Sequence, residues 1–181
     1  MGVTDSSGDF VLTIDELREV TRYAVEAAQG VVDVFELSQP DDARPRDAIG
    51  AAWDFVNGAT RSNRQRVAAR DAHRAAKEAT SEAAACAAQS AGDAAAAAYL
   101  HPLAKATQVG HILRAAANAA RVAELQAGDD PAAGTASINQ AVERATPLLV
   151  DVLRRYPDAS QGQSRVAQLM AGLDAQLRLA R

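Results

Sequence analysis

The feature that most constrains this chain is a run of alanines near its middle. Eleven of the sixteen residues from 83 to 98 are alanine. Alanine has the highest helix propensity, and its methyl side chain lets neighbouring helices approach closely. A helix that is apolar on nearly every side belongs in the centre of a fold. We therefore expect residues 81–100 to form a central helix in which any ionisable side chain is exceptional.

The composition is that of an ordinary globular chain. Its 181 residues suit one domain, with 48% hydrophobic and 23% charged residues. Aromatic residues make up only 4%, so the core must come from Ala, Val and Leu. The net charge of −4 argues against nucleic-acid binding as a main role. The single cysteine, Cys86, cannot form a disulfide within the chain, and we expect it to be a small buried hydrophobe.

Apolar residues recur at three- and four-residue spacing along most of the chain, which predicts helices. The fold class is therefore all-α: a single-domain bundle of six or seven helices with alanine-rich central helices. We expect residues 1–11 to be a flexible N-terminal leader and residues 12–181 to be the helical-bundle domain. The expected helices are 13–37, 45–57, 62–80, 81–100, 102–127, 135–156 with a bend or restart at Pro147, and 164–179.

The sequence also suggests where the protein resides. The polar N-terminus lacks the basic and apolar regions of a signal peptide. No apolar segment approaches the ~20 residues that a membrane span needs. We therefore expect no membrane span and a cytoplasmic protein.

No short motif with an established mechanism occurs in the chain. A glycine-rich phosphate loop, His-Glu-x-x-His and Cys-x-x-Cys are all absent from the sequence. We therefore expect no metal and no cofactor, and we assign no catalytic residue. If the protein is an enzyme, the candidate acid–base residues are Asp71, Asp93, His101 and His111.

Asp93 is the ionisable residue that stands out, because it lies between Gly92 and five alanines. It shares one side of its helix with Glu82, Cys86, Gln89 and Leu100. This side is either the one wet face of the helix or the place of an inward carboxylate beside a cavity. A buried carboxylate must be paired or protonated, and either state is chemically useful.

The three histidines have different settings. His101 precedes Pro102 at a helix junction, where it either caps the helix or forms the rim of a pocket. His111 belongs to a polar stripe that is exposed or pairs with another helix; the stripe continues through Arg114, Asn118 and Arg121. We expect His73 to point away from the apolar face of its helix, towards the side of Arg66, Arg70 and Lys77.

Two aromatic side chains complete the candidate pocket. Trp53, the only tryptophan, is either the largest core filler or a stacking wall. In the second interpretation Trp53 and Tyr99 would be the walls of a ligand pocket whose polar groups are Asp93 and His101.

Several ordered segments carry a family resemblance. They are Arg44-Pro45-Arg46-Asp47-Ala48-Ile49 leading to Trp53, Arg70-Asp71-Ala72-His73, Ser90-Ala91-Gly92-Asp93, Tyr99-Leu100-His101-Pro102 and Ala106-Thr107-Gln108-Val109-Gly110-His111. Together, from about residue 12 to 179, they resemble the Imm-5-like putative immunity proteins. More closely, the chain resembles an actinobacterial group often labelled "exonuclease SbcC". That label looks wrong for this chain, which has neither the phosphate loop nor the coiled coils of such an ATPase.

The resemblance implies an all-helical intracellular protein with an immunity role, and it supplies no catalytic residues. Many members are expected to carry a histidine near the position of Asp93, so no shared metal or acid–base role carries over. Our leading hypothesis is a non-enzymatic binding protein, an immunity protein that occludes a toxin. The alternative is a small-molecule binding protein or enzyme with a cavity between the central helices. A third hypothesis is a helical module that forms homodimers through its alanine-rich faces.

Overall fold

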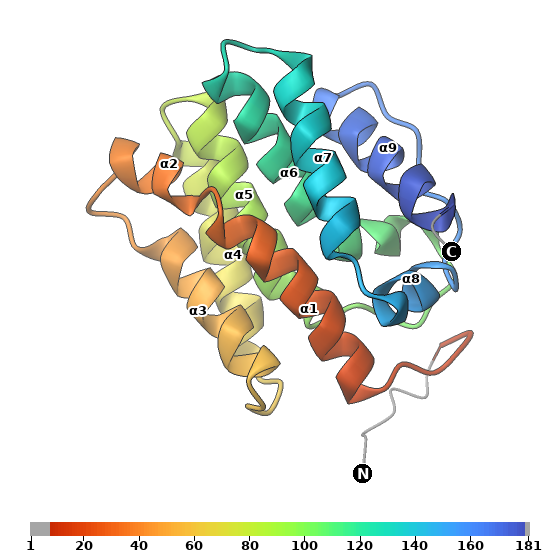
Figure 1. Ribbon diagram of the computed structural model, residues 1–181. Coiled ribbons are helices and arrows are strands. Elements are labelled where there is room, and N and C mark those ends of the chain that lie inside the picture. The colour runs from red at the N-terminus through yellow and green to blue at the C-terminus, as the bar shows by residue number, and fades with distance from the viewer. Residues whose placement is uncertain (1–7, 180–181) are drawn as a thin grey trace.

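The computed structural model describes residues 8–179, and within this range the chain is helical without any strand. The all-α class is thus confirmed (Figure 1). The described residues form nine α-helices and one 3-10 turn, more than the six or seven expected. They are α1 (Ile14–Gln29), α2 (Val32–Ser38), α3 (Arg44–Val56), α4 (Asn63–Glu78), α5 (Glu82–Ala97), the turn η1 (Ala106–Gln108), α6 (Val109–Gln126), α7 (Pro131–Arg144), α8 (Pro147–Leu153) and α9 (Arg165–Leu179).

The expected helix 13–37 is two helices, α1 and α2, because the chain turns at Gly30 and Val31. Glycine is a weak helix former, and Val31 leaves helical geometry with φ −129° and ψ −6°. The turn lets α2 pack on α5 and bury Val32 and Phe35 completely. Phe35 is thus buried as its spacing predicts, but on a helix of its own.

The expected helix 135–156 is also two helices, and Pro147 restarts the chain rather than bending it. Ala145 is extended, with ψ 126°, and ends α7. Thr146 then caps α8 by accepting a hydrogen bond from the backbone of Leu149. Proline is well suited to the first turn of α8, where its missing N–H has no partner to lose.

Helix α5 lies in the middle of the bundle, as its alanines predict (Figure 1). It packs against α1, α2, α3, α4 and α6, and eleven of its sixteen residues are buried. Cys86 is one of them, as expected; burial raises the pKa of its thiol to about 11. The thiol is therefore protonated at neutral pH and packs as an apolar group.

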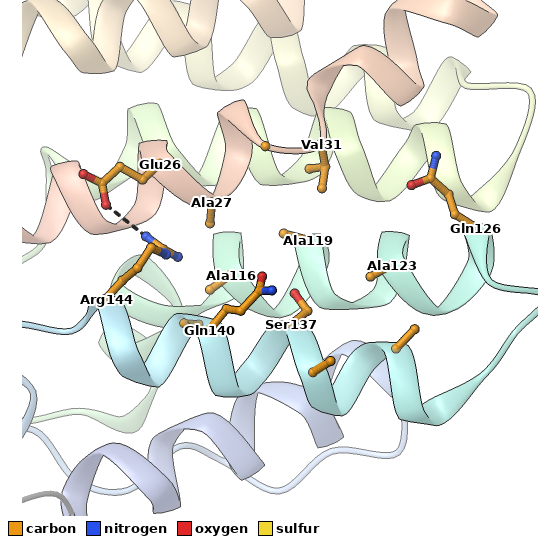
Figure 2. A pocket seen from close by; sticks show the side chains of 14 residues that line it. Glu26, Ala27, Val31, Ala116, Ala119, Ala123, Gln126, Ser137, Gln140 and Arg144 are labelled. Atoms are coloured by element: carbon orange, nitrogen blue, oxygen red, sulfur yellow. Dashed lines mark hydrogen bonds and ion pairs between the residues drawn. The ribbon is translucent and has the colours of Figure 1, made fainter.

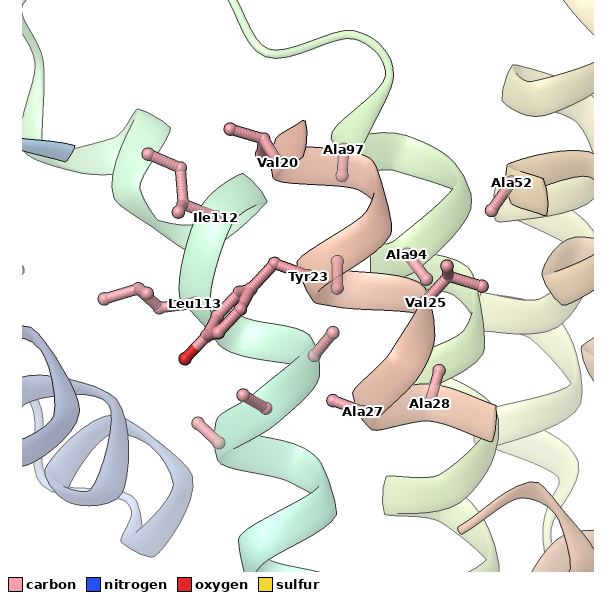
Figure 3. Close-up of a cluster of buried hydrophobic side chains, with 14 of the residues drawn as sticks. Val20, Tyr23, Val25, Ala27, Ala28, Ala52, Ala94, Ala97, Ile112 and Leu113 are labelled. Carbon is pink, nitrogen blue, oxygen red and sulfur yellow. The ribbon is translucent and has the colours of Figure 1, made fainter. Parts of the chain in front are cut away.

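The main core fills the space between α1 and its neighbours (Figure 3). Tyr23 of α1 is buried beside α6, where Leu113 lies, and its hydroxyl donates to the carbonyl of Ala141 in α7 (3.1 Å). The largest fully buried side chains are Phe35 and Phe55. Trp53 is only partly buried at the edge of the core, so it is not the chief core filler.

The end of the expected leader is attached to the loop after α5. The backbone N–H of Asp9 donates to the carbonyl of Pro102 (2.7 Å), and the Asp9 carboxylate accepts from the backbone of Ala104 (2.8 Å). Phe10 packs edge-on against Tyr156 with ring centroids 5.0 Å apart. Residues 1–7 and 180–181 lie outside the described range. None of the helices in that range is both long and apolar enough to cross a membrane.

Candidate functional site

The inward carboxylate of α5 is surrounded by polar groups from three helices. Asp93 is 1% exposed and is in contact with five donor atoms. Arg114 of α6 contacts both oxygens, with Nη2 2.7 Å from Oδ1 and Nε 3.0 Å from Oδ2. The remaining contacts are from His73 Nε2 (3.2 Å), Gln89 Nε2 (3.3 Å) and Asn118 Nδ2 (3.3 Å). Asp93 is therefore an inward carboxylate and not part of a wet face, but it lines neither of the hollows described below.

The carboxylate is held in its charged form. Burial by itself would raise the pKa of Asp93, because it removes water from the charge. Hydrogen bonds from His73 and Arg114, and the charge of Arg114, outweigh burial and hold the pKa below its usual value of 3.8. In turn, the hydrogen bond to Asp93 raises the pKa of Arg114. Asp93 and Arg114 thus form an ion pair at neutral pH.

His73 reaches Asp93 because residue 92 is glycine. A Cβ at Gly92 would lie 2.2 Å from His73 Cδ2 and 2.5 Å from Nε2, a position that the imidazole already occupies. The same Cβ would be 3.0 Å from the carbonyl oxygen of Ala69. Helices α4 and α5 therefore approach closely at this point, and the ring of His73 lies across α5 where a side chain is missing.

The expected direction of His73 needs correction. His73 does share a side of α4 with Arg70 and Lys77, but the edge of that side faces α5. A helical wheel cannot reveal which edge of a charged face contacts the next helix. The polar stripe of α6 was expected to be exposed or to pair with another helix, and it pairs with α5 through Arg114 and Asn118.

His111 lies in the same neighbourhood and is largely buried. Its Nδ1 is buried without a hydrogen-bond partner among residues 8–179. Burial lowers the pKa of His111, and the positive charge of Arg114 lowers it further, while Asp93 opposes the shift. His101 and His73 also lower this pKa, so all three histidines of the chain act on one region.

His101 is exposed on the loop after α5 and does not contact Asp93. Its backbone N–H donates to Oε1 of Gln108 (3.0 Å), and its carbonyl accepts from the hydroxyl of Tyr156 (2.8 Å). The backbone of His101 therefore fixes the loop, and the link between His101 and this region is its small contribution to the lowered pKa of His111.

The other candidate residues are separate from Asp93. Asp71 forms an ion pair with Arg74 on the surface of α4. Trp53 donates from Nε1 to the side chain of Gln29 (2.7 Å). Tyr99 donates to the carbonyl of Ser62 (2.5 Å), and its ring lies beneath cations described below. The structure thus joins Asp93 to His73 and Arg114, and it does not place Trp53, Tyr99 and His101 around it.

Two hollows are relevant to binding. The first, here called the α1–α7 groove, has a volume of about 440 Å³ and lies between α1 and α7 over α6 (Figure 2). Its floor is formed by alanines 116, 119 and 123 of α6. An ion pair between Glu26 and Arg144 (3.0 Å) lies at one end, and Gln126 lies at the other.

The second, here called the α4 hollow, has a volume of about 470 Å³ and lies on the outer side of α4. It is lined by Arg70, Asp71, His73, Arg74 and Lys77. His73 therefore takes part in both the Asp93 cluster and this hollow. No group of three His, Cys, Asp or Glu side chains among residues 8–179 could hold a metal ion.

Comparison with known proteins gives one match. The model of a family described as "Imm-5 like putative immunity protein" matches residues 11–147, which is more than half of the chain. Neither a curated protein nor a solved structure matches the chain.

Proposed function

Because this chain belongs to the Imm-5 like putative immunity protein family, we propose that it is a non-enzymatic binding protein that neutralises a protein toxin by occluding it. Family membership is the observation that carries the proposal. The partner is then a protein, and the chain provides a rigid helical surface. The cytoplasm, where such a toxin would act on its own producer, is the compartment that this function requires.

The Asp93 cluster supports a binding scaffold better than a catalytic site. Both carboxylate oxygens accept hydrogen bonds, and Arg114 contacts them in a bidentate manner. A general base needs a free lone pair within reach of a substrate proton, and Arg114 would have to leave to provide one. The cluster instead connects α4, α5 and α6, and so it stiffens the centre of the bundle.

The alternative function, a small-molecule site between the central helices, lacks such support. It requires Asp93 and His101 to meet in one cavity. Asp93 is enclosed by His73, Gln89, Arg114 and Asn118, whereas His101 is exposed on a loop. Neither Asp93 nor His101 lines the α1–α7 groove or the α4 hollow. For the third hypothesis, a homodimer through alanine-rich faces, α5 offers little surface because most of it is buried inside the bundle, and the alanines that line a surface hollow belong chiefly to α6 and α7.

A rescue assay tests the proposal. The gene product encoded beside this chain would be expressed in a bacterial host with and without the chain, and growth would be recorded. We expect the neighbour to arrest growth, the chain to restore it, and the two proteins to co-purify as a complex. Growth arrest that persists when this chain is present at a molar excess, with no complex on size-exclusion chromatography, would contradict the proposal.

Charge reversal then locates the contact face. A chain of net charge −4 favours a basic toxin through electrostatic steering. Two matched pairs of exposed carboxylates have no ion-pair partner among residues 8–179: Asp41 and Asp47 near the start of α3, and Glu143 and Asp151 on α7 and α8. We expect one of the doubles D41K/D47K and E143K/D151K to slow association at least tenfold, and the other to act as its control. Equal association rates for the wild type and both double variants would contradict electrostatic steering of the toxin by either of these two faces.

A further inference from the structure

The outer side of α4 concentrates positive charge in an acidic protein. Residues 61–78 contain six arginines and lysines but only two carboxylates, whereas the whole chain has a net charge of −4. Most of these cations have partners in the structure. Arg64 pairs with Asp54 and Arg74 pairs with Asp71, while Arg61 and Arg66 lie over the ring of Tyr99 at 5.1 and 4.0 Å from its centroid.

Two cations of this surface have neither an ion-pair partner nor an aromatic ring beneath them in the part of the chain that the structure describes: Arg70 and Lys77. They lie three residues before and four residues after His73, so the three side chains share one face of α4. All three line the α4 hollow. The hollow is therefore bounded by two uncompensated charges with an imidazole between them.

The imidazole of His73 is held on its buried side by Asp93. His73 is 28% exposed, and its Nε2 is directed at the buried carboxylate of Asp93. Since Nε2 is engaged, Nδ1 is the ring nitrogen left for other contacts, and it has no hydrogen-bond partner among residues 8–179. When the ring is protonated, Nδ1 becomes a third donor beside Arg70 and Lys77.

The arrangement that brings His73 to Asp93 lowers the stability of the fold, and two helices that only packed against each other would not need to lose this stability. A glycine inside a helix makes the helix less stable than alanine would, and Gly92 is needed to admit the ring of His73. A buried ion pair is often no more stable than well-packed apolar side chains. The chain nevertheless keeps Gly92, Asp93 and Arg114 in its central helices, and their joint effect is to hold an imidazole at the edge of a cationic hollow.

We propose that the α4 hollow is an anion-binding site that takes an oxyanion group, a carboxylate or a phosphate, between Arg70, His73 and Lys77. Arg70 offers a planar fork of donors that suits such groups, and Lys77 adds a compact charge. Two sources supply such a group, a free solute and an acidic side chain of a protein partner, and the ligands below distinguish them. The three side chains that contact the anion all lie on α4, and anion binding can be measured on the protein alone, so the site does not depend on the toxin-neutralising function.

The histidines themselves provide the readout. The chain has only three, so their ring signals in ¹H–¹³C NMR spectra can be assigned by single substitution. We would titrate the protein with inorganic phosphate at pH 6.5, replacing chloride to keep the ionic strength constant. The expected result is a saturable shift that is largest at His73, with a dissociation constant in the millimolar range. Shifts that do not saturate, or that are equal at all three rings, would show an adventitious ion only and would overturn the site.

A matched pair of double variants separates the site from general charge. R70Q/K77Q removes the two cations of the hollow, and R22Q/K105Q removes one arginine and one lysine that are exposed elsewhere without ion-pair partners in the described range. Both doubles change the net charge equally. Phosphate binding should weaken at least tenfold in R70Q/K77Q and stay within twofold of wild type in R22Q/K105Q. Equal weakening in the two doubles would overturn the proposal, and both variants change exposed side chains that the fold does not need.

Two ligands distinguish the sources of the anion. A hexaglutamate peptide should compete with phosphate for the His73 shift. If the peptide binds at least tenfold more tightly than phosphate, the acidic side chains of a partner are the source of the anion. If the peptide binds no more tightly than phosphate, the source is a free anion. Failure of both ligands to bind would overturn the site. Failure of the growth-rescue assay would leave these titrations unaffected, so the two proposals can fail separately.

Discussion

Arg114 of α6 holds both oxygens of Asp93 of α5, with contacts of 2.7 and 3.0 Å, at a depth where the carboxylate is 1% exposed. The Arg114 side chain as a whole is 40% exposed. The ion pair therefore extends from the centre of the bundle to its surface, and only the Arg114 end is accessible to water. This asymmetry determines what happens when either partner is changed.

Asp93→Asn should destabilise the fold by about 2–3 kcal/mol. The amide keeps the shape of the side chain but leaves Arg114 without its counter-charge; losing one partner of a fully buried pair costs about 3–5 kcal/mol, and the exposure of Arg114 reduces this cost. Urea denaturation followed by circular dichroism at pH 7 measures the loss. Asp71→Asn is the control, because its ion pair with Arg74 lies on the surface and should contribute less than about 1 kcal/mol. Similar losses in the two variants would contradict the buried role of Asp93.

Gly92→Ala should displace the ring of His73 without unfolding the protein. The new methyl group occupies the place of the imidazole, so the contact between His73 and Asp93 is lost. The loss of one hydrogen bond, about 1 kcal/mol, is offset by the higher helix propensity of alanine, about 1 kcal/mol. The methyl group also lies 3.0 Å from the backbone carbonyl oxygen of Ala69, so the net change in unfolding free energy should be a loss of about 1 kcal/mol. The ring signals of His73 in NMR spectra should move to those of an exposed histidine.

Gly50→Ala is the matched control for that substitution. Gly50 also lies inside a helix, α3, but a Cβ there would meet nothing within 4 Å. This variant should gain about 0.5–1 kcal/mol of stability from helix propensity and leave the His73 signals unchanged. If the Gly92 variant gains as much stability and also keeps the His73 signals, the ring does not depend on the missing side chain.

Much of the fold could be predicted from spacing and alanine content. The central position of α5 follows from a helix that is apolar on nearly every side, and the proline and glycine positions mark most helix ends. The two missed breaks have local causes. At Gly30 and Val31 a continuous apolar stripe conceals a turn, and after this turn Phe35 packs in a cluster with alanines of α5. At Pro147 the sequence left a bend and a restart open, and Thr146 decides between them as a cap.

The candidate site was predictable only in part. Asp93 is recognisable because a carboxylate among alanines has to be paired. Its partners His73 and Arg114 lie about twenty residues before and after it in the sequence. Each of them belongs to a polar helix face, and such a face is equally typical of a helix side that is exposed to solvent. Gly92 is the one local signal that could have found His73, since a glycine inside a helix often marks a close approach.

Ala94→Leu should test how tightly α5 is packed. Ala94 is completely buried in the main core near α1 (Figure 3). Three extra carbons in a well-packed core force side chains from their preferred rotamers and cost about 1–3 kcal/mol. Ala85→Leu is the control on the same helix, because Ala85 is partly exposed and lines a small surface hollow. Thermal unfolding should show a clear loss for the first variant and almost none for the second; equal melting temperatures would mean that α5 is not close-packed.

His111 should make the protein less stable as the pH falls below about 6.5. Burial and the charge of Arg114 lower the pKa of His111 in the folded state below its usual value of 6.5, with His101 and His73 adding to the effect and Asp93 opposing it. The unfolded chain therefore takes up a proton first, so the contribution of neutral His111 is complete above pH 6.5 and is lost as the pH decreases towards the folded-state pKa. Over that window the slope reaches at most about 1.4 kcal/mol per pH unit. His111→Gln removes the titrating group, so the difference in unfolding free energy between variant and wild type, measured by urea denaturation, should change in favour of the variant between pH 7.5 and pH 5. A difference that is constant with pH would mean that His111 titrates alike in both states, and that its buried Nδ1 is not protected from protonation.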